Sequence, residues 1–299
     1  MQAVYRNGGS ALPCVASREW EATHAGLSSG AAAGKGTGRL DRTMKGGGAM
    51  RLSYDLHIHS CLSPCGDADM TPNNIVHMAL LAGFDMIALT DHNTCGNCPA
   101  LLTVAREAGL TAVPGMELCT AEEAHVVCLF PELEAAMAFD AAVAPTLPPV
   151  RNRPDIFGEQ LMMDAGDEIV GRRDILLTTA SSISVEEVLP LARSFGGTAF
   201  PAHIDRESYS VLSALGDIPA VGFRAVEITA RGDLPALLAR YPETREKPLL
   251  LNSDAHYLHQ LGDPAAWLEL PERSAAALVA ALDGRLPCGW GRSGFEGGV

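Results

Sequence analysis

Short apolar runs alternate with segments of helical periodicity from Arg51 onward. The runs are bounded by glycine, proline or polar residues and are too short for helices, so we predict that they are β-strands. The helical segments join consecutive strands, which predicts βα units around a mostly parallel sheet. The predicted strands cover residues 54–58, 86–90, 111–114, 125–130, 197–201, 225–229 and 249–252.

The first helical segment has clear boundaries. Thr71 is a favourable N-cap, Pro72 suits the first helical turn, and Gly83 suits the left-handed position that ends a helix. Seven strands with intervening helices favour an α/β barrel over a doubly wound sheet. The other predicted helices cover residues 99–108, 132–140, 185–194, 209–215, 234–241 and 272–282.

Two stretches interrupt this alternation. Residues 1–49 are rich in glycine and lack a sustained period, which predicts a flexible leader. Residues 145–182 contain several prolines and only short β-like pieces, which predicts an insertion. The barrel would then consist of residues 50–144 and 183–285, followed by a tail, 286–299. Met50 precedes the first periodic segment, which leads to the hypothesis that native translation starts there.

The composition narrows the class of protein. The chain has 299 residues, 36 acidic and 22 basic side chains, and a formal net charge of −14. This charge disfavours binding to long duplex nucleic acid. The sequence shows neither a membrane-spanning apolar run nor a signal peptide, so we predict a cytoplasmic protein without a membrane partner. The oligomeric state stays open.

Histidines and carboxylates gather at the predicted strand ends. His57 and His59 are two residues apart at the end of a strand, where both rings can face one point. Strand ends of a parallel barrel converge on one face, so these groups are expected to meet there. Imidazole and carboxylate donors suit zinc, manganese or iron, and their number predicts more than one ion. The other residues of this kind are His92, Glu117, His125, His203, Asp254 and His256.

The same residues form five motifs in order: His57-x-His59, Thr90-Asp91-His92, Gly115-x-Glu117, Pro201-x-His203 and Ser253-Asp254-x-His256. This series resembles the PHP (polymerase and histidinol phosphatase) family of metal-dependent phosphoesterases, in particular its tryptophan-operon-linked branch. The resemblance implies a distorted (β/α)7 TIM-like barrel, the PHP fold, that holds two or three divalent ions (Mn, Zn or Fe). It also implies nine metal ligands: His57, His59, Asp67, His92, Glu117, His125, His203, Asp254 and His256. Asp67 is chosen from its distance to Thr71-Pro72, and Asp69 is the alternative.

The resemblance further implies a hydrolase of phosphate esters, acting as a nucleotidase or exonuclease through a metal-bound hydroxide. Glu117 would bridge two ions, Asp254 and His256 would position the hydroxide, and His203 or His125 would protonate the leaving oxygen. The expected substrate is a phosphorylated small molecule, a nucleotide or a short oligonucleotide. Alternatives are a small-molecule phosphomonoesterase such as histidinol-phosphate phosphatase, and a non-catalytic metal-binding module.

Three further side chains are candidates for supporting roles. Arg206 is a candidate for binding the substrate phosphate, because a guanidinium matches phosphate oxygens, although an ordinary surface arginine fits the sequence equally well. Asp91 is a candidate for orienting a ligand imidazole. The pairs Cys61 and Cys65, and Cys95 and Cys98, raise the hypothesis of a separate metal site, with reduced loop cysteines as the alternative.

Overall fold

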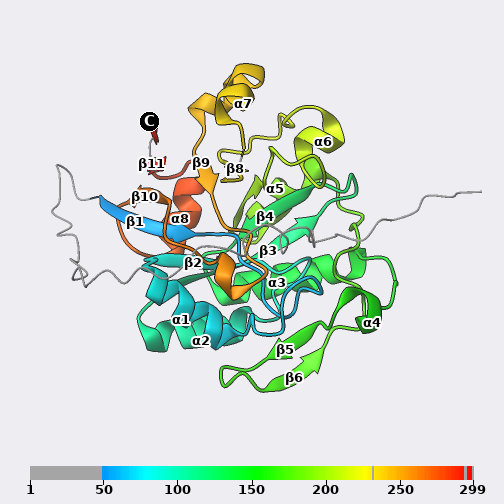
Figure 1. Ribbon diagram of the computed structural model, residues 1–299. Helices are drawn as coiled ribbons and strands as arrows, with labels where there is room; N and C mark the ends of the chain where they lie inside the picture. Colours follow the sequence, from blue (N-terminus) through cyan, green and yellow to red (C-terminus); the bar gives the residue numbers. More distant parts are fainter. Residues whose placement is uncertain (1–48, 231, 293–294, 298–299) are drawn as a thin grey trace, which may run out of the picture. The chain divides into compact units, whose positions relative to one another are not determined.

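The apolar runs form strands at the predicted places (Figure 1). The computed structural model describes residues 49–230, 232–292 and 295–297, so the expected leader lies outside the described residues except for its last residue. The main sheet has eight strands in the order β12-β11-β10-β1-β2-β3-β4-β7. These are β1 (Met50–Asp55), β2 (Met86–Leu89), β3 (Thr111–Cys119), β4 (His125–Leu129), β7 (Thr198–Pro201), β10 (Ala266–Leu270), β11 (Gly289–Arg292) and β12 (Phe295–Gly297).

The direction of β4 departs from the sequence prediction. Strands β1, β2 and β3 are parallel, but β4 runs antiparallel to both of its neighbours, β3 and β7. Only residues 120–124 connect β3 to β4, and Thr120 N donates to the Ala124 carbonyl oxygen at 2.8 Å across this turn. A parallel crossover needs a dozen or more residues, so this connection enforces a hairpin. The expected mostly parallel arrangement is therefore wrong at β4, and the pairs β1–β10, β10–β11 and β11–β12 are antiparallel as well.

A second sheet contains the parallel strands β8 (Val226–Ile228) and β9 (Leu249–Leu251). Backbone hydrogen bonds just beyond the strand ends connect the two sheets. Ile204 N donates to the Glu227 carbonyl oxygen, and His59 N donates to the Ala255 carbonyl oxygen, both at 2.9 Å. The result is an α/β fold with a curled main sheet. The strand pairing does not establish the expected closed barrel of seven βα units, because the strands belong to two sheets.

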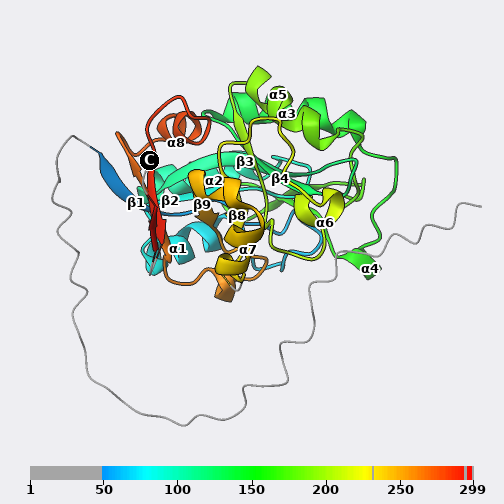
Figure 2. The ribbon, with the colours of Figure 1, turned by 90° about the horizontal axis from the view of Figure 1, so that it is seen from above.

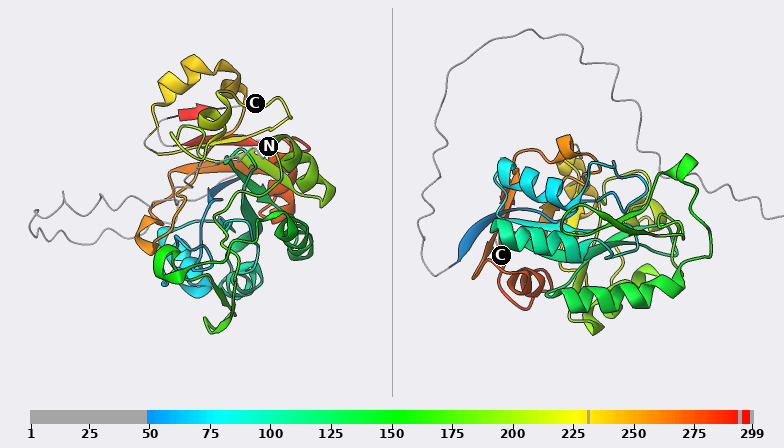
Figure 3. Two further views of the ribbon diagram at one scale, coloured as in Figure 1. Left: turned by 90° about the vertical axis from the view of Figure 1, so that its right-hand side faces the viewer. Right: turned by 90° about the horizontal axis from the view of Figure 1, so that it is seen from below.

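Helices pack on the outside of the sheet. α3, α5 and α8 lie along one side, and α1 and α2 lie side by side elsewhere (Figures 2 and 3). The α1 boundaries follow the sequence: Thr71 Oγ1 accepts from Asn74 N, and Gly83 has a φ of 88°. The helices are α1 (Pro72–Ala82), α2 (Cys98–Ala108), α3 (Leu133–Val143), α4 (Pro154–Phe157), α5 (Val185–Ser194), α6 (Val211–Leu215), α7 (Leu234–Arg240) and α8 (Ala275–Leu282), with short 3-10 turns η2 (Ala144–Thr146), η3 (Pro242–Glu246) and η4 (Leu258–Gln260). No helix in the described residues combines the length and the apolar character needed to cross a bilayer.

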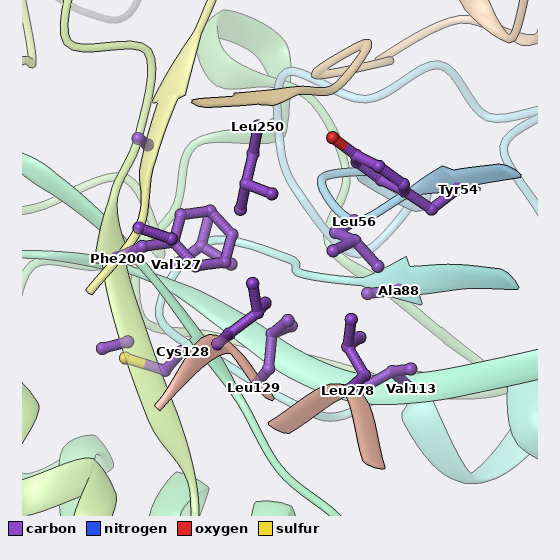
Figure 4. Packing of buried hydrophobic residues seen from close by; sticks show 14 of the residues in the cluster. Tyr54, Leu56, Ala88, Val113, Val127, Cys128, Leu129, Phe200, Leu250 and Leu278 are labelled. Carbon is purple, nitrogen blue, oxygen red and sulfur yellow. The ribbon is translucent and has the colours of Figure 1, made fainter. Parts of the chain in front are cut away.

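Strands from both sheets contribute side chains to one apolar interior. Figure 4 shows Leu56, Val127, Phe200 and Leu250 pointing toward one another, and all four side chains are fully buried. Because helices cover the outer face of the main sheet, several strands are buried on both faces. All residues of β2 and β4 are buried, which explains why these strands appear in the sequence as continuous apolar runs.

Residues 145–182 contain the hairpin of β5 (Leu161–Met163) and β6 (Ile169–Arg172). This hairpin lies below and to the right of α1 and α2 in the view of Figure 1. Two asparagines attach this segment to the loop after β2. Asn93 Nδ2 donates to the carbonyl oxygens of Leu177 and Thr179, at 2.7 and 2.8 Å. Asn97 Nδ2 donates at 3.0 Å to the Leu161 carbonyl oxygen and, at the same distance, to Ser60 Oγ in the loop after β1. The segment is thus hydrogen-bonded to both loops.

Candidate metal centre

The main sheet and β9 deliver histidines and carboxylates to one edge. His57 and His59 follow β1, His92 follows β2, and His203 follows β7, so each lies beyond the carboxyl end of its strand. His125 is the first residue of β4. Because β4 is antiparallel, its amino end lies at the same edge as the carboxyl ends of β3 and β7. The reversed strand thus brings His125 to the other histidines.

The Glu117 carboxylate occupies the middle of this group. It is 1% exposed, and imidazoles approach both of its oxygens. The Oε1 atom lies 3.1 Å from His57 Nε2, 2.9 Å from His125 Nδ1 and 3.2 Å from His203 Nε2. The Oε2 atom lies 2.8 Å from His92 Nδ1 and 3.3 Å from His59 Nε2. The structure therefore gathers five of the predicted histidines around one carboxylate.

Asp254 forms the other side of the centre. Its Oδ1 atom lies 3.3 Å from His57 Nε2 and 3.1 Å from His59 Nε2, while its Oδ2 atom lies 2.6 Å from an Arg206 guanidinium nitrogen. The His256 ring stacks on His59 with centroids 4.2 Å apart. His256 Nδ1 donates to the Asp254 carbonyl oxygen at 2.9 Å, which leaves Nε2 free to bind an ion.

Two of these residues have a backbone conformation that L-amino acids rarely adopt. The φ angles of His203 and Asp254 are 26° and 50°. Such conformations are costly and persist where surrounding contacts enforce them, most often at functional sites. His203 is fixed by its backbone N, which donates to Glu227 Oε1 at 3.0 Å. Next to Asp254, Ser253 N donates to Asp55 Oδ1 at 3.2 Å.

Glu227 is a supporting residue that the sequence analysis missed. This carboxylate is 2% exposed and accepts from His57 Nδ1 at 3.0 Å and from Asn252 Nδ2 at 2.7 Å. A carboxylate on the far nitrogen of an imidazole fixes the ring and raises its basicity toward an ion. The available signal was a lone acidic residue inside the apolar strand β8.

Asp91 supports a ligand histidine indirectly. Its Oδ1 atom accepts from Ser63 Oγ at 2.7 Å and from Ser60 N at the same distance. Ser63 Oγ in turn accepts from His59 Nδ1 at 2.9 Å. Asp91 is thus connected to the His59 imidazole through Ser63, whereas the sequence predicts that Asp91 orients an imidazole directly.

The carboxylates and imidazoles of the centre shift one another's pKa values. Burial alone would raise the pKa values of Glu117 and Asp254, but the surrounding imidazoles hold both well below the ordinary range. Burial alone would lower the pKa values of His57 and His59, but the carboxylates outweigh it and raise that of His59 to about 9. For His256 burial prevails and lowers the pKa to about 3. Ionised carboxylates and neutral imidazoles are the forms that bind ions.

Several nitrogen and oxygen atoms that could bind a metal ion are buried without a hydrogen-bond partner within the described part of the chain. They include both ring nitrogens of His92, Glu117 Oε2 and Asp254 Oδ1. The short distances around these atoms therefore lack hydrogen-bond geometry, as expected when lone pairs converge on an ion. Three groups have ligand atoms spaced to hold one: His59, His92 and His256; His57, His59 and Glu117; and His92, Glu117 and His125. This nitrogen and oxygen donor set fits Zn, Mn or Fe.

Asp67 contacts the edge of this centre through its backbone. Its backbone N donates to the His256 carbonyl oxygen at 2.9 Å, so the residue lies at the rim. Its half-buried carboxylate accepts from Asp69 N at 2.9 Å and belongs to none of the three groups. The alternative, Asp69, is exposed. Arg206 lies at the rim as well, with 44% of its side chain exposed.

The four loop cysteines do not join a metal-binding group among the described residues. Cys95 Sγ lies 3.2 Å and Cys98 Sγ 3.6 Å from the Gly115 carbonyl oxygen, whereas Cys61 packs with Leu161 and Met163. Burial raises the pKa of Cys61 to about 12, which keeps that thiol protonated. Cys65 is half-buried. These positions favour the interpretation as reduced loop and core cysteines.

Residues 55–165 match the family model of the PHP domain. Over this range the chain is similar to a PHP domain. The matched range includes His57, His59, His92, Glu117 and His125, and it ends before His203, Asp254 and His256. The geometry described above brings the residues inside and outside the matched range together at the same edge.

Sequence relatives match a short part of this chain. A 5'-3' exoribonuclease of Haemophilus influenzae is 35% identical over 83 residues, which are 27% of this chain and 29% of the relative. The 5'-3' exoribonuclease Rnm of Salmonella typhimurium is 36% identical over 76 residues, or 25% of each chain. The chain therefore matches less than a third of the length of these two relatives.

A solved structure shares the fold over a larger part of the chain. The lesion-specific endonuclease PfuEndoQ from Pyrococcus furiosus superposes with a TM-score of 0.56 at 19% sequence identity, covering 80% of this chain and 57% of that one. Endonuclease Q in complex with a 27-mer duplex that carries an abasic lesion gives the same TM-score and covers 58% of that chain. At this identity the likeness concerns the fold.

Proposed function

We propose that this protein is a metal-dependent phosphoesterase that hydrolyses phosphate esters of nucleotides or short oligonucleotides. The observation that carries the proposal is the convergence of six imidazoles on the buried carboxylates of Glu117 and Asp254. The PHP-domain match and the exoribonuclease relatives support the same class of reaction. In this proposal the two sheets act as a (β/α)7-like barrel whose open edge holds two or three ions.

Divalent ions in this centre would polarise the phosphoryl group and lower the pKa of water there. The ligands would be His57, His59, His92, Glu117, His125, His203, Asp254 and His256, with Asp67 as a ninth candidate at the rim. Glu117 can contact two ions because imidazoles approach both of its oxygens. Asp254 would share this role on the side of Arg206.

Arg206 would bind the substrate phosphate. Its guanidinium is fixed by Asp254 and is nearly half exposed, so further N–H groups are open to a ligand. His203 lies 3.2 Å from Glu117 and is a candidate for protonating the leaving oxygen. The expected exclusion of long duplex substrates finds no support in the relatives, since endonuclease Q shares this fold and binds a duplex.

The test is turnover by the purified full chain with Mn or Zn. The substrates are nucleoside monophosphates, 3',5'-bisphosphates, short RNA and DNA, duplex DNA and an aryl phosphate. We expect His57→Ala and Asp254→Ala to lose bound metal and turnover while circular dichroism stays unchanged. The matched control is His77→Ala, because His77 is exposed on α1 and its Nδ1 atom bonds to the Asn73 carbonyl oxygen of the same helix.

Three outcomes would contradict the proposal or a part of it. Absence of turnover on every substrate at full metal occupancy would favour the alternative of a non-catalytic metal-binding module. Full activity of His57→Ala would show that the ligand assignment is wrong. Turnover restricted to small phosphomonoesters would favour the phosphomonoesterase alternative over a nuclease.

A further inference from the structure

A cavity of about 260 Å³ lies between the end of α3, the loop after β2 and residues 172–177. None of the proposed metal ligands lines it. Its walls combine the apolar side chains of Leu147 and Ile175 with the charged side chains of Asp140, Arg172 and Arg173. The cavity is therefore a second polar site, separate from the candidate metal centre.

Arg173 is held in a defined position in this cavity. One of its terminal nitrogens donates to Asp140 Oδ2 at 3.0 Å and to Thr94 Oγ1 at 3.2 Å. Asp140 is in turn fixed by Thr94 Oγ1, at 2.6 Å, and by Cys95 N, at 2.8 Å. Arg173 Nε is buried and has no hydrogen-bond partner in the described residues. The Arg173 side chain is nevertheless 32% exposed, so its remaining N–H groups are open to a phosphate oxygen.

The other side chains that line the cavity indicate which chemical groups would bind there together with the phosphate. Arg172 is exposed, and its pair with Glu159 is an exposed contact of 3.2 Å that a ligand anion can replace at little cost. Leu147 and Ile175 offer an apolar surface for a flat ring. The exposed Asp174 carboxylate also lines the cavity, where it would repel a phosphate but accept from a hydroxyl or amino group.

We propose that this cavity binds a nucleoside monophosphate, with the phosphate at Arg173 and the nucleoside against Leu147 and Ile175. The volume is below the roughly 300 Å³ at which pockets begin to enclose drug-sized ligands, so part of the nucleoside stays in solvent. Asn93 and Thr94 line the cavity and directly follow His92. The bound nucleotide therefore contacts the loop that carries a candidate metal ligand.

The test is isothermal titration of AMP, and separately of inorganic phosphate, into the full chain without added metal, so that the candidate metal centre does not turn AMP over. Leu147→Trp fills the cavity and leaves the Arg173–Asp140 pair in place, whereas Arg173→Gln removes the phosphate contact. We expect each variant to weaken AMP binding at least about 10-fold. The matched control is Arg153→Gln, because Arg153 is an exposed arginine paired with Asp155 outside the cavity. Its AMP affinity should equal that of the unmodified chain.

The metal-centre variant His57→Ala separates the two sites. We expect it to keep the AMP affinity of the cavity, and loss of binding in this variant would place the nucleotide at the metal centre and overturn the proposal. Unchanged AMP affinity in Leu147→Trp, or equal affinities for AMP and inorganic phosphate, would overturn it as well. The proposal does not depend on phosphoester hydrolysis, which is measured by turnover.

Discussion

At the scale of single residues, the candidate metal centre consists of side chains that could bind an ion and of side chains, such as Glu227, that hold them in position. His57, His59, His92, Glu117, His125, His203, Asp254 and His256 carry recognisable motifs, and their side chains meet. Glu227 has no motif, and its role depends on a contact with His57 that spans a large part of the chain. Asp67 was chosen by counting back from Thr71-Pro72, and a count cannot show that its carboxylate turns toward Asp69 N.

The first prediction concerns Glu227→Gln. The amide preserves the shape but removes the negative charge from His57 Nδ1 and from the His203 backbone N. We expect metal affinity to fall about 10- to 100-fold, as for other residues that orient a ligand histidine. Metal titration of the variant checks this, with the exposed Glu186→Gln as the control. An unchanged affinity would show that Glu227 has only a structural role.

The second prediction concerns the double variant Cys95→Ser/Cys98→Ser. Both thiols are buried against the Gly115 carbonyl oxygen and lie outside the metal-binding groups. We expect an unchanged number of bound ions and a free energy of unfolding lower by about 1–3 kcal/mol, because two buried hydroxyls would share the Gly115 carbonyl oxygen as acceptor in otherwise apolar surroundings. Elemental analysis and urea denaturation measure the two effects. Loss of an ion would revive the hypothesis of a cysteine site.

At the scale of elements, residues at the helix ends predicted the helix boundaries, whereas the direction and the partner of each strand depend on the rest of the sheet. Thr71, Pro72 and Gly83 define α1 because caps act within a turn of the helix. The direction of β4 depends on the hairpin after Cys119, which the sequence analysis overlooked because it ended the preceding strand at Pro114. Strands β10 and β11 were missed: β10 pairs with β1 from the opposite end of the chain, and no local pattern encodes that partner.

The third prediction belongs to β3, where Gly115 precedes Glu117 by two residues. A Cβ atom there would lie 2.7 Å from the Cys128 carbonyl oxygen and 2.8 Å from Leu129 Cδ2 on β4. We expect Gly115→Ala to lower the free energy of unfolding by about 1–3 kcal/mol, because the neighbouring strand must move. Gly262→Ala is the control, since a Cβ there meets nothing within 4 Å. Chemical denaturation of both variants provides the comparison, and equal stabilities would contradict the packing argument.

At the scale of the whole molecule, the alternation of strands and helices predicted the α/β class and the common edge at which the candidate ligands meet. It did not predict that β8 and β9 form a sheet apart from the main sheet, because the periodicity of a segment does not determine which strands pair. The segment 145–182 was recognised by its prolines, but its attachment through Asn93 and Asn97 depends on loops far away in sequence. The domain boundaries that we drew from composition stay predictions.

The attachment through Asn97 has a consequence for cooperativity. One amide joins Ser60, beside a candidate ligand, to Leu161 and Met163 of the β5–β6 hairpin. Ions that immobilise the loop after β1 would therefore also slow the local opening of the hairpin. We expect hydrogen exchange at Leu161 and Met163 to slow when Mn is added, and Asn97→Ala to remove this protection. The hairpin would then report on occupancy of a centre that it does not touch.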